Sequence, residues 1–314
     1  MSILNHFIPQ TLLVAMGIIF GFLTICSTVF WGLHRRKPSD FFQELITRTR
    51  SWWFIALGIA IVVLGPPLWG TILIGYVAFV ALREMFSISG FRESDRPALF
   101  VAYFTVPVQF YFAYTLLMTP FYVFIPMGMF VLTGFILVLG GNTVKIGRSM
   151  PLIPTLVMLT VYMLSHLVLL YHQEFTGYTL GGGGLILYLV MLTAFNDVFQ
   201  FTWGKMLGKR KILPSVSPNK TWEGFIGGVL SSGVLGWALH FLTPLEDWQG
   251  FVVGLVLSVV GFMGDAIMSA VKRDLFLKDT DDLIPGHGGA MDRLDSIVMT
   301  SPFFFHLLTF FTSV

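Results

Sequence analysis

Long apolar stretches recur along this whole chain, and they constrain its fold more than any other feature. The mean hydropathy is +0.79, and only 11% of the residues are charged. A soluble chain carries about 25% charged residues. A stretch of roughly 20 apolar residues is long enough to cross the hydrocarbon core of a bilayer. The sequence therefore predicts an all-α fold, a polytopic transmembrane helix bundle.

The candidate spans are 11–31, 51–65, 67–83, 98–118, 120–140, 151–171, 184–204, 223–243, 250–270 and 297–313. Within 51–83, Gly65-Pro66-Pro67 breaks one apolar run into two short ones, which are either two helices or a re-entrant pair. We therefore expect about nine to ten spans. The first stretch is interpreted as a membrane helix rather than a signal peptide, because it lacks a basic flank and a small-residue cleavage site.

Basic residues alternate between the segments that connect these spans. They occur in 32–50, 83–97, 141–150, 205–222 and 271–296, whereas the intervening segments contain no Lys or Arg. The positive-inside rule then predicts that all five basic segments are cytoplasmic and that both termini lie outside. This alternation favours ten crossings. The expected location is a bacterial cytoplasmic (inner) membrane.

Composition also limits the partners and the chemistry. The net charge of +2 is too small, and too dispersed among loops, to predict a nucleic-acid partner. The single cysteine, Cys26, excludes an intrachain disulfide and a cysteine metal site. The glycines Gly181 to Gly184 are interpreted as a flexible linker in an outer segment.

Lys, Arg and Asp are concentrated in the run 269–295, which directly follows an apolar stretch containing Asp265. Charges beside a membrane helix are costly without a partner that satisfies them. Pro285-Gly286-His287-Gly288-Gly289 adds a turn whose backbone N–H groups could approach an anion. The alternative is a solvated loop of salt bridges. The combination favours a site for phosphates and a metal at the membrane surface.

Two further segments carry polar residues on the same side of the predicted topology. Asp197 lies in the predicted span 184–204 and Asp265 in the predicted span 250–270. Both are therefore acids within apolar helices. Carboxylates without cysteine partners favour a hard cation such as Mg²⁺. The segment 217–224 is typical of a helix start, with Ser217 or Thr221 as the cap and Lys220 beside it.

The motifs in these segments resemble those of a known family, the CDP-diacylglycerol synthases, also called phosphatidate cytidylyltransferases. The similarity covers about residues 184 to 300. It lies in Asn196-Asp197, in Ser217-Pro218-Asn219-Lys220-Thr221-Trp222-Glu223-Gly224, and in the run from Ser269 to Asp295 with its Pro-x-His-Gly-Gly-x2-Asp-Arg-Leu-Asp end. The chain departs from the family pattern at Gln200-Phe201, Asn219, Asp281 and Ala290.

The resemblance implies an enzyme of phospholipid biosynthesis that makes CDP-diacylglycerol and pyrophosphate from CTP and phosphatidic acid. It implies that Asp197, Lys220, Asp265 and Asp292 are catalytic, and that Asp265 and Asp292 bind Mg²⁺, with a second cation such as K⁺ left open. The expected substrate-binding residues are Ser217, Lys272, Arg273, Lys278, His287 and Arg293. Asp279 and Asp295 are expected to orient the basic side chains among these residues. A homodimer is expected by analogy alone.

We expect residues 1–180 to form the N-terminal transmembrane helices and residues 181–314 to form the catalytic transmembrane region. Two alternatives remain open. One is a related CTP-dependent transferase or kinase that acts on another membrane lipid. The other, of a different class, is an anion transporter, which would place charges at the midplane of several spans.

Overall fold

The computed structural model describes residues 8–36, 38–277, 280 and 289–312, and within these ranges the protein is almost entirely helical. The helices of the N-terminal half are α1 (Gln10–Arg36), α2 (Asp40–Leu64), α3 (Pro67–Ile88), α4 (Arg96–Tyr103), α5 (Thr105–Tyr114), α6 (Met118–Val123), α7 (Phe130–Leu139), α8 (Ile146–Val157) and α9 (Met163–His172). The C-terminal half contains α10 (Gly181–Leu207), β1 (Lys211–Leu213), β2 (Ser217–Thr221), α11 (Trp222–Ala238), α12 (Asp247–Asp274) and α13 (Met291–Thr312).

Nine helical segments among the described residues are long and apolar enough to cross a membrane. Three of them are composite: α4 with α5, α6 with α7, and α8 with α9. In the last two, the parts are joined by π-helical turns at Phe124–Met129 and Met158–Tyr162. The shorter apolar helix α11, of 17 residues, lies beside two of these segments, α10 and α12. The protein is therefore an all-α polytopic membrane protein, as the composition predicts.

The run 51–83 forms two helices rather than one broken span. Helix α2 ends at Leu64, and α3 begins at Pro67, where the missing N–H of proline costs no helical hydrogen bond. Each helix is long enough to cross a membrane. The boundary of α2 also corrects the predicted connection at 32–50, because Arg48 and Arg50 lie within this helix rather than in a loop.

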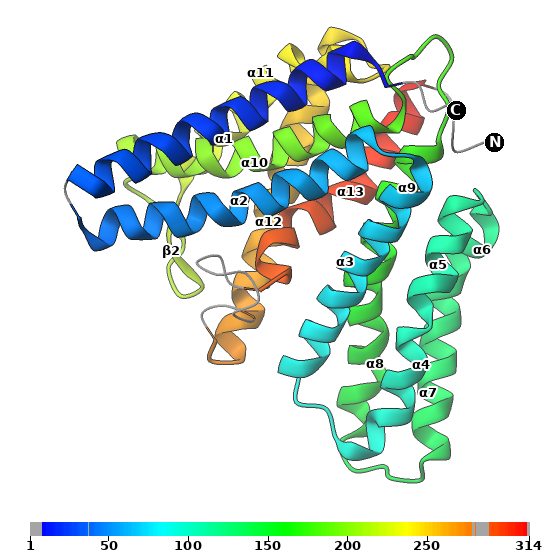
Figure 1. The fold of residues 1–314 in the computed structure, drawn as a ribbon. Helices are drawn as coiled ribbons and strands as arrows, with labels where there is room; N and C mark the ends of the chain where they lie inside the picture. Colours follow the sequence, from blue (N-terminus) through cyan, green and yellow to red (C-terminus); the bar gives the residue numbers. More distant parts are fainter. Residues whose placement is uncertain (1–7, 37, 278–279, 281–288, 313–314) are drawn as a thin grey trace.

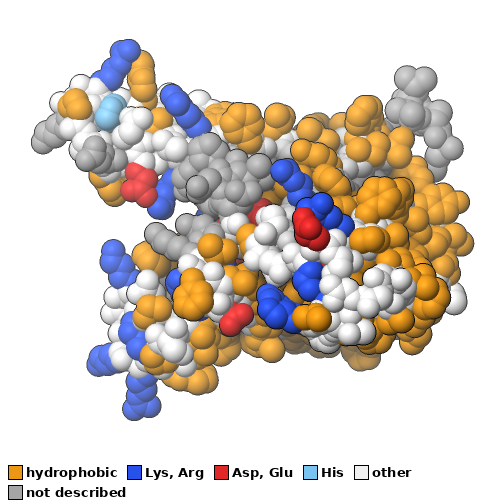
Figure 2. Space-filling model, turned by 90° about the horizontal axis from the view of Figure 1, so that it is seen from below, with side chains coloured by type: hydrophobic (Ala, Val, Ile, Leu, Met, Phe, Trp, Pro, Cys, Tyr) orange, Lys and Arg blue, Asp and Glu red, His pale blue; other side chains and the backbone are white. Residues whose placement is uncertain are grey.

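Among the described connections that carry basic residues, the α1–α2 turn and the hairpin of β1 and β2 lie toward the left of Figure 1, and the α3–α4 and α7–α8 connections lie at its bottom. The turns α2–α3 and α11–α12, the start of α1 and the end of α13 lie toward the upper right. Successive helices thus run back and forth between these two sides of the molecule. In Figure 2, which shows the underside, Lys and Arg side chains gather over the left and centre, and hydrophobic side chains cover the right.

Large apolar side chains cover the sides of the helices. Phe54, Phe135 and Phe310 are 79%, 59% and 76% exposed. Contiguous apolar surface on this scale marks a surface that is covered in the native setting. In a chain of helices long enough to span, that cover is the lipid hydrocarbon.

The helices form two groups that share α9 and α13. Helices α1, α2, α10 and α11 run side by side across the upper part of Figure 1, and α3, α4–α5, α7 and α8 form a second group that runs downward. Helix α13 packs against both α12 and α9 and so joins the groups. Its buried Phe304 stacks on Tyr188 of α10, with ring centroids 5.3 Å apart.

Glycines form the contact between α10, α11 and α12, and we call this the glycine seam. It consists of Gly204, Gly224, Gly228, Gly236, Gly250 and Gly254. A Cβ atom built at Gly236 would overlap the carbonyl oxygen of Gly250, and one at Gly254 would overlap that of Ser232. Small residues let membrane helices pack backbone to backbone. The seam therefore fixes the spacing of the three helices that carry the C-terminal motifs.

The prediction of a flexible linker at Gly181–Gly184 is wrong. These residues form the first turn of α10, and Gly182, Gly183 and Gly184 are buried. A Cβ atom at Gly182 would overlap the backbone of Tyr171, and one at Gly183 would overlap the carbonyl oxygen of Val63. Glycine is needed here for close packing rather than for flexibility.

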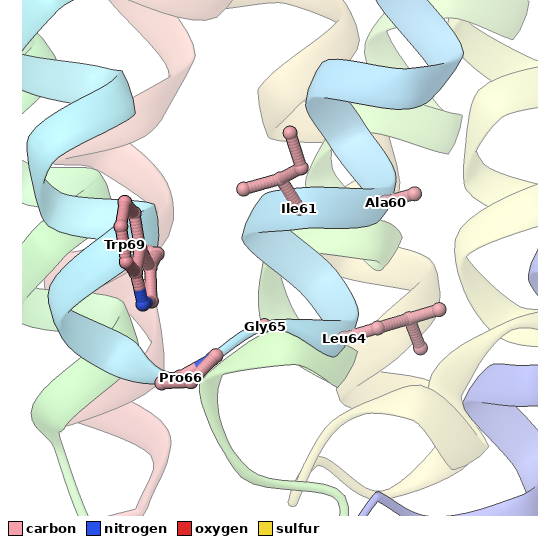
Figure 3. Close-up of a pocket in the computed structure, with 6 residues that line it drawn as sticks. All are labelled: Ala60, Ile61, Leu64, Gly65, Pro66 and Trp69. Atoms are coloured by element: carbon pink, nitrogen blue, oxygen red, sulfur yellow. The ribbon is translucent and has the colours of Figure 1, made fainter. Parts of the chain in front are cut away.

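An apolar pocket lies at the turn between α2 and α3 (Figure 3). Its lining residues are Ala60, Ile61, Leu64, Gly65, Pro66 and Trp69. It lies at the end of the molecule opposite the basic connections. No charged side chain lines it, so it offers no group that could bind a phosphate or a metal.

Candidate active site

The residues of the three sequence motifs meet at one end of α10, α12 and α13. The segment 205–222, predicted as a basic connection that ends in a helix start, contains an antiparallel hairpin of β1 and β2. Thr221 then caps α11, because its hydroxyl accepts a hydrogen bond of 3.2 Å from Gly224 N. Glu223 in the first turn accepts one of 2.9 Å from Lys209 N and closes the hairpin onto the helix. The predicted helix start is confirmed, with Thr221 rather than Ser217 as the cap.

The first ion pair of the site joins Lys220 at the end of β2 to Asp265 in α12. Lys220 Nζ lies 2.6 Å from Asp265 Oδ2, and the side chains are 15% and 35% exposed. The ammonium also lies 4.3 Å from the centre of the Phe262 ring. Asp265 Oδ1 accepts a hydrogen bond of 3.2 Å from Ser269 Oγ. Within the described part of the chain, Lys220 Nζ makes no hydrogen bond besides this ion pair.

The second ion pair joins Lys272 in α12 to Asp292, which lies in the first turn of α13 rather than in a loop. Lys272 Nζ lies 2.7 Å from Asp292 Oδ1. Asp292 Oδ2 accepts hydrogen bonds from Thr280 N at 2.8 Å and from Gly289 N at 3.1 Å. The Thr280 hydroxyl lies 2.9 Å from the same oxygen. The carboxylate is only 5% exposed, so these contacts fix its orientation.

Three carboxylates of the site interact electrostatically. The carboxylate of Asp265 repels those of Asp197 in α10 and Asp295 in α13, and the carboxylates of Asp197 and Asp295 repel each other. Like charges gathered in a weakly polar setting repel, unless cations lie among them. The positive charges of Lys220 and Arg293 attract the Asp197 carboxylate, and that of Lys272 attracts the Asp295 carboxylate. The structure thus groups acids and bases from four separate elements into one cluster.

Asn196 connects the three helices beside Asp197. Its Oδ1 accepts hydrogen bonds from Ser258 of α12 at 2.5 Å, Gln200 at 2.9 Å and Ser232 of α11 at 3.3 Å. Asn196 is 2% exposed. It therefore fixes α10 against α11 and α12, and with it the position of the next residue, Asp197. Gln200, one of the departures from the family pattern, belongs to this network.

Some expected substrate-binding residues have other contacts. Arg273 donates to the carbonyl oxygens of Val216, at 3.4 Å, and Leu277, at 3.3 Å. Ser217 begins β2 and is half-buried, whereas Arg293 is exposed on α13. Lys278, Asp279, Asp281 and His287 lie outside the described residues.

The two aspartates expected to bind a metal differ in the lone pairs they have available. A carboxylate offers about four acceptor positions. Asp265 uses two of them and is one-third exposed, so it fits a metal ligand as it stands. Asp292 fits one only when Lys272 releases Oδ1, because its Oδ2 already faces three donors. No three metal-binding side chains converge in the described ranges.

One residue of the site, Glu84, was missed by the sequence analysis. The predicted span 67–83 ends just before it, whereas α3 continues to Ile88 and buries it at 4% exposure. Its carboxylate accepts hydrogen bonds from Ala290 N at 2.7 Å, from Met291 N at 3.1 Å and from the Thr280 hydroxyl. The signal in the sequence was an acid directly followed by the apolar pair Met85-Phe86.

The family model described as "Cytidylyltransferase family" matches residues 46–311. The chain therefore belongs to the cytidylyltransferase family. This membership makes it a nucleotidyltransferase and implies CTP and a lipid as substrates. With its spanning helices, the protein is an integral multi-pass membrane protein.

Individual relatives differ in how much of the chain they resemble. YnbB of Escherichia coli (strain K12), described as an uncharacterized protein, is 33% identical over 301 residues, which cover 94% of this chain and 98% of the relative. The phosphatidate cytidylyltransferase of Bacillus subtilis (strain 168) is 40% identical over 129 residues, or 40% of this chain and 48% of the relative. That of Staphylococcus aureus (strain COL) is 39% identical over 119 residues, or 37% and 46%. The chain thus aligns with about half the length of the named enzymes.

Proposed function

We propose that this protein is a CTP:phosphatidate cytidylyltransferase, which makes CDP-diacylglycerol and pyrophosphate from CTP and phosphatidic acid. The observation that carries the proposal is the ion pair of Lys220 with Asp265 beside Asp197, which joins three separate segments of the chain into one cluster. The named enzymes that the chain resembles over part of its length support the choice of acceptor.

The reaction is a displacement at phosphorus. An oxygen of the lipid phosphate forms a bond to the α-phosphorus of CTP, and the bond from that phosphorus to the bridging oxygen breaks. Pyrophosphate leaves with the electron pair. The nucleophile is already an anion, so the main obstacle is bringing two anions together in the correct geometry.

The chain's cations suit that task. Lys220 has donors left for a phosphate, since its ammonium makes only the ion pair to Asp265 among the described residues. Lys272 lies beside Asp292 and would bind a second phosphate when it moves away. Arg293, exposed on α13, would neutralise phosphate charge at the solvent-facing edge of the site.

Mg²⁺ would be held by Asp265 and by Asp292 after Lys272 releases it. It would take the rest of its coordination from phosphate oxygens and water, as Mg²⁺ commonly does in proteins. A bound metal would neutralise the charge that develops on the phosphoryl oxygens. A second cation such as K⁺ belongs to the same proposal.

The location of the site completes the proposal. The basic connections lie at one end of the bundle together with the cluster of acids and bases, and the positive-inside rule would place that end in the cytoplasm, where CTP is available. The lipid acceptor would arrive laterally from the bilayer. A homodimer is part of the proposal by family analogy only.

A second candidate keeps the chemistry and changes the acceptor. YnbB, which matches nearly the whole chain, is described as an uncharacterized protein, and the named phosphatidate cytidylyltransferases match only about 40% of the chain. This pattern favours a CTP-dependent transferase for another membrane lipid phosphate as the alternative.

The test is incubation of the purified protein in detergent micelles with radiolabelled CTP, Mg²⁺ and one of several lipids. We expect a labelled CDP-lipid and pyrophosphate with phosphatidic acid. Product with only another lipid phosphate would support the second candidate, and transfer of the γ-phosphate to a lipid alcohol would indicate a kinase. No product with any acceptor, together with uptake of an anion in proteoliposomes, would indicate a transporter instead.

A further inference from the structure

Glu84 is an acid buried in a membrane-spanning helix that carries none of the family motifs. It lies in α3 and is 4% exposed. An acid in a span is costly unless other groups satisfy it, and such residues commonly mark functional sites. Among the described residues, the partners of the Glu84 carboxylate are Thr280, Ala290 and Met291, which lie in the segment that surrounds Asp292.

The first set of contacts fixes the beginning of α13. Ala290 N and Met291 N, both at the start of that helix, donate to the Glu84 carboxylate at 2.7 and 3.1 Å. The first N–H groups of a helix have no partner within the helix, and a negative charge near them is favourable. Glu84 thus acts as a cap that another helix supplies. Asp292 is the next residue after Met291, so this cap determines where its side chain lies.

The second contact connects the two carboxylates through one hydroxyl group. Thr280 Oγ1 is within hydrogen-bonding distance of Glu84 Oε1 and lies 2.9 Å from Asp292 Oδ2. A hydroxyl has a single proton to donate, so the two acids share it. Thr280 N donates to Asp292 at 2.8 Å as well. Thr280 is 5% exposed, so a water molecule cannot readily replace its hydroxyl group as the donor to the two acids.

The packing around this link leaves no free space. A Cβ atom built at Gly289 would overlap both Glu84 Oε1 and Thr280 Oγ1. Gly289 N in turn donates to Asp292 Oδ2 at 3.1 Å. A glycine of the family motif is therefore required here because it makes room for a carboxylate from α3.

From these contacts we propose that Glu84 is a positioning residue for Asp292. It acts through Thr280 and through the start of α13, and it makes an N-terminal helix part of the catalytic machinery. The proposal depends on the proposed function only for what Asp292 does once it is positioned.

The experiment compares Glu84→Gln, Thr280→Val and the double variant with the wild-type protein. Glu84→Gln replaces one carboxylate oxygen by an NH₂ group, which faces backbone N–H groups as a second donor. Thr280→Val removes the shared hydroxyl without a change of charge. Glu93→Gln is the control, because Glu93 is an exposed acid whose ion pair among the described residues is with Arg96, at 3.1 Å.

We expect kcat to fall on the order of 10- to 100-fold in each single variant, with little change in KM for the lipid, as for other residues that orient a ligand. The double variant should be no slower than the slower single variant. Hydrogen exchange at Ala290 and Met291 should become faster in Glu84→Gln, while the variant elutes as the wild type does in size-exclusion chromatography. Glu93→Gln should match the wild type.

The exchange measurement separates this proposal from the proposed function. If the wild-type protein turns over no lipid, the function is wrong, and exchange at Ala290 and Met291 still tests the cap. Unchanged exchange in Glu84→Gln would overturn the positioning role. Wild-type kcat in both single variants, or losses that simply multiply in the double variant, would overturn it as well.

Discussion

Lys220 Nζ lies 2.6 Å from Asp265 Oδ2, which places the end of the β-hairpin directly against the middle of the cluster of acids. Lys220 belongs to the motif 217–224 at the end of β2, whereas Asp265 lies in α12, just before the run 269–295. Their contact converts a pattern of separate motifs into a single site, and it has a direct consequence for mutants.

Loss of either partner should remove the activity of the whole site. We expect Lys220→Met and Asp265→Ala each to lower kcat about 10²- to 10³-fold, the usual effect of removing one group that stabilises a transition state. The double variant should be no worse than the worse single variant, because residues that act as a unit are not additive. Turnover of CTP in membranes is the measurement, and immunoblots check that the protein still inserts.

Asp292→Ala should behave in the same way, whereas Glu44→Gln, at an exposed surface pair with Arg48, should keep full activity. Full activity in both Asp265→Ala and Asp292→Ala would contradict the assignment of the site.

Removal of divalent metal should stop the reaction. Asp265 has free acceptor positions and partial exposure, so a metal held there should exchange with solvent. We expect EDTA to reduce product formation to background, and excess Mg²⁺ to restore it. EDTA already saturated with Mg²⁺ is the control. Undiminished turnover after EDTA treatment and gel filtration would show that no exchangeable metal takes part.

A single methyl group in the glycine seam should destabilise the protein. Gly236→Ala places a Cβ atom against the Gly250 carbonyl, and overpacking of this kind costs about 1–3 kcal/mol. Gly21→Ala in α1 is the matched control, since nothing lies within 4 Å of the added atom. Thermal unfolding in detergent should show a lower midpoint for Gly236→Ala only. Equal midpoints for both variants would mean that the seam is looser than the structure shows.

The topology can be tested with thiol labelling in a Cys26→Ser background. Lys211→Cys is on the hairpin side and Thr176→Cys is on the opposite side, and both positions are exposed. We expect a membrane-impermeant maleimide to label Thr176→Cys in intact cells and Lys211→Cys only in inverted vesicles. The reverse pattern would place the site on the outer face and contradict the proposal that it uses cytoplasmic CTP.

The amino-acid pattern predicts the fold well, because the period and length of an apolar helix are encoded locally. The break at Gly65-Pro66 and the cap at Thr221 are examples, since each depends on residues a few positions apart. The glycines at 181–184 show the limit. A run of glycine is compatible with flexibility or with close packing, and only the neighbours Tyr171 and Val63 decide between them.

The site was predictable to the extent that its residues lie in recognisable motifs. The structure brings Asp197, Lys220, Asp265 and Asp292 to one end of the bundle. Their catalytic and metal-binding roles remain predictions. Glu84 could not be found in this way, because its partner Thr280 is 196 residues away and nothing in the local sequence connects them. Likewise, only the fold shows that Lys272 forms an ion pair with Asp292 and that Arg273 donates hydrogen bonds to backbone carbonyl oxygens.

The glycine seam has a mechanical consequence. Where α10, α11 and α12 touch through backbone atoms, there are few side chains that could change rotamer and absorb a shift between the helices. A displacement of one helix is then transmitted undiminished to the next. Asp197 of α10 and Asp265 of α12 should accordingly move as one rigid body when a ligand binds.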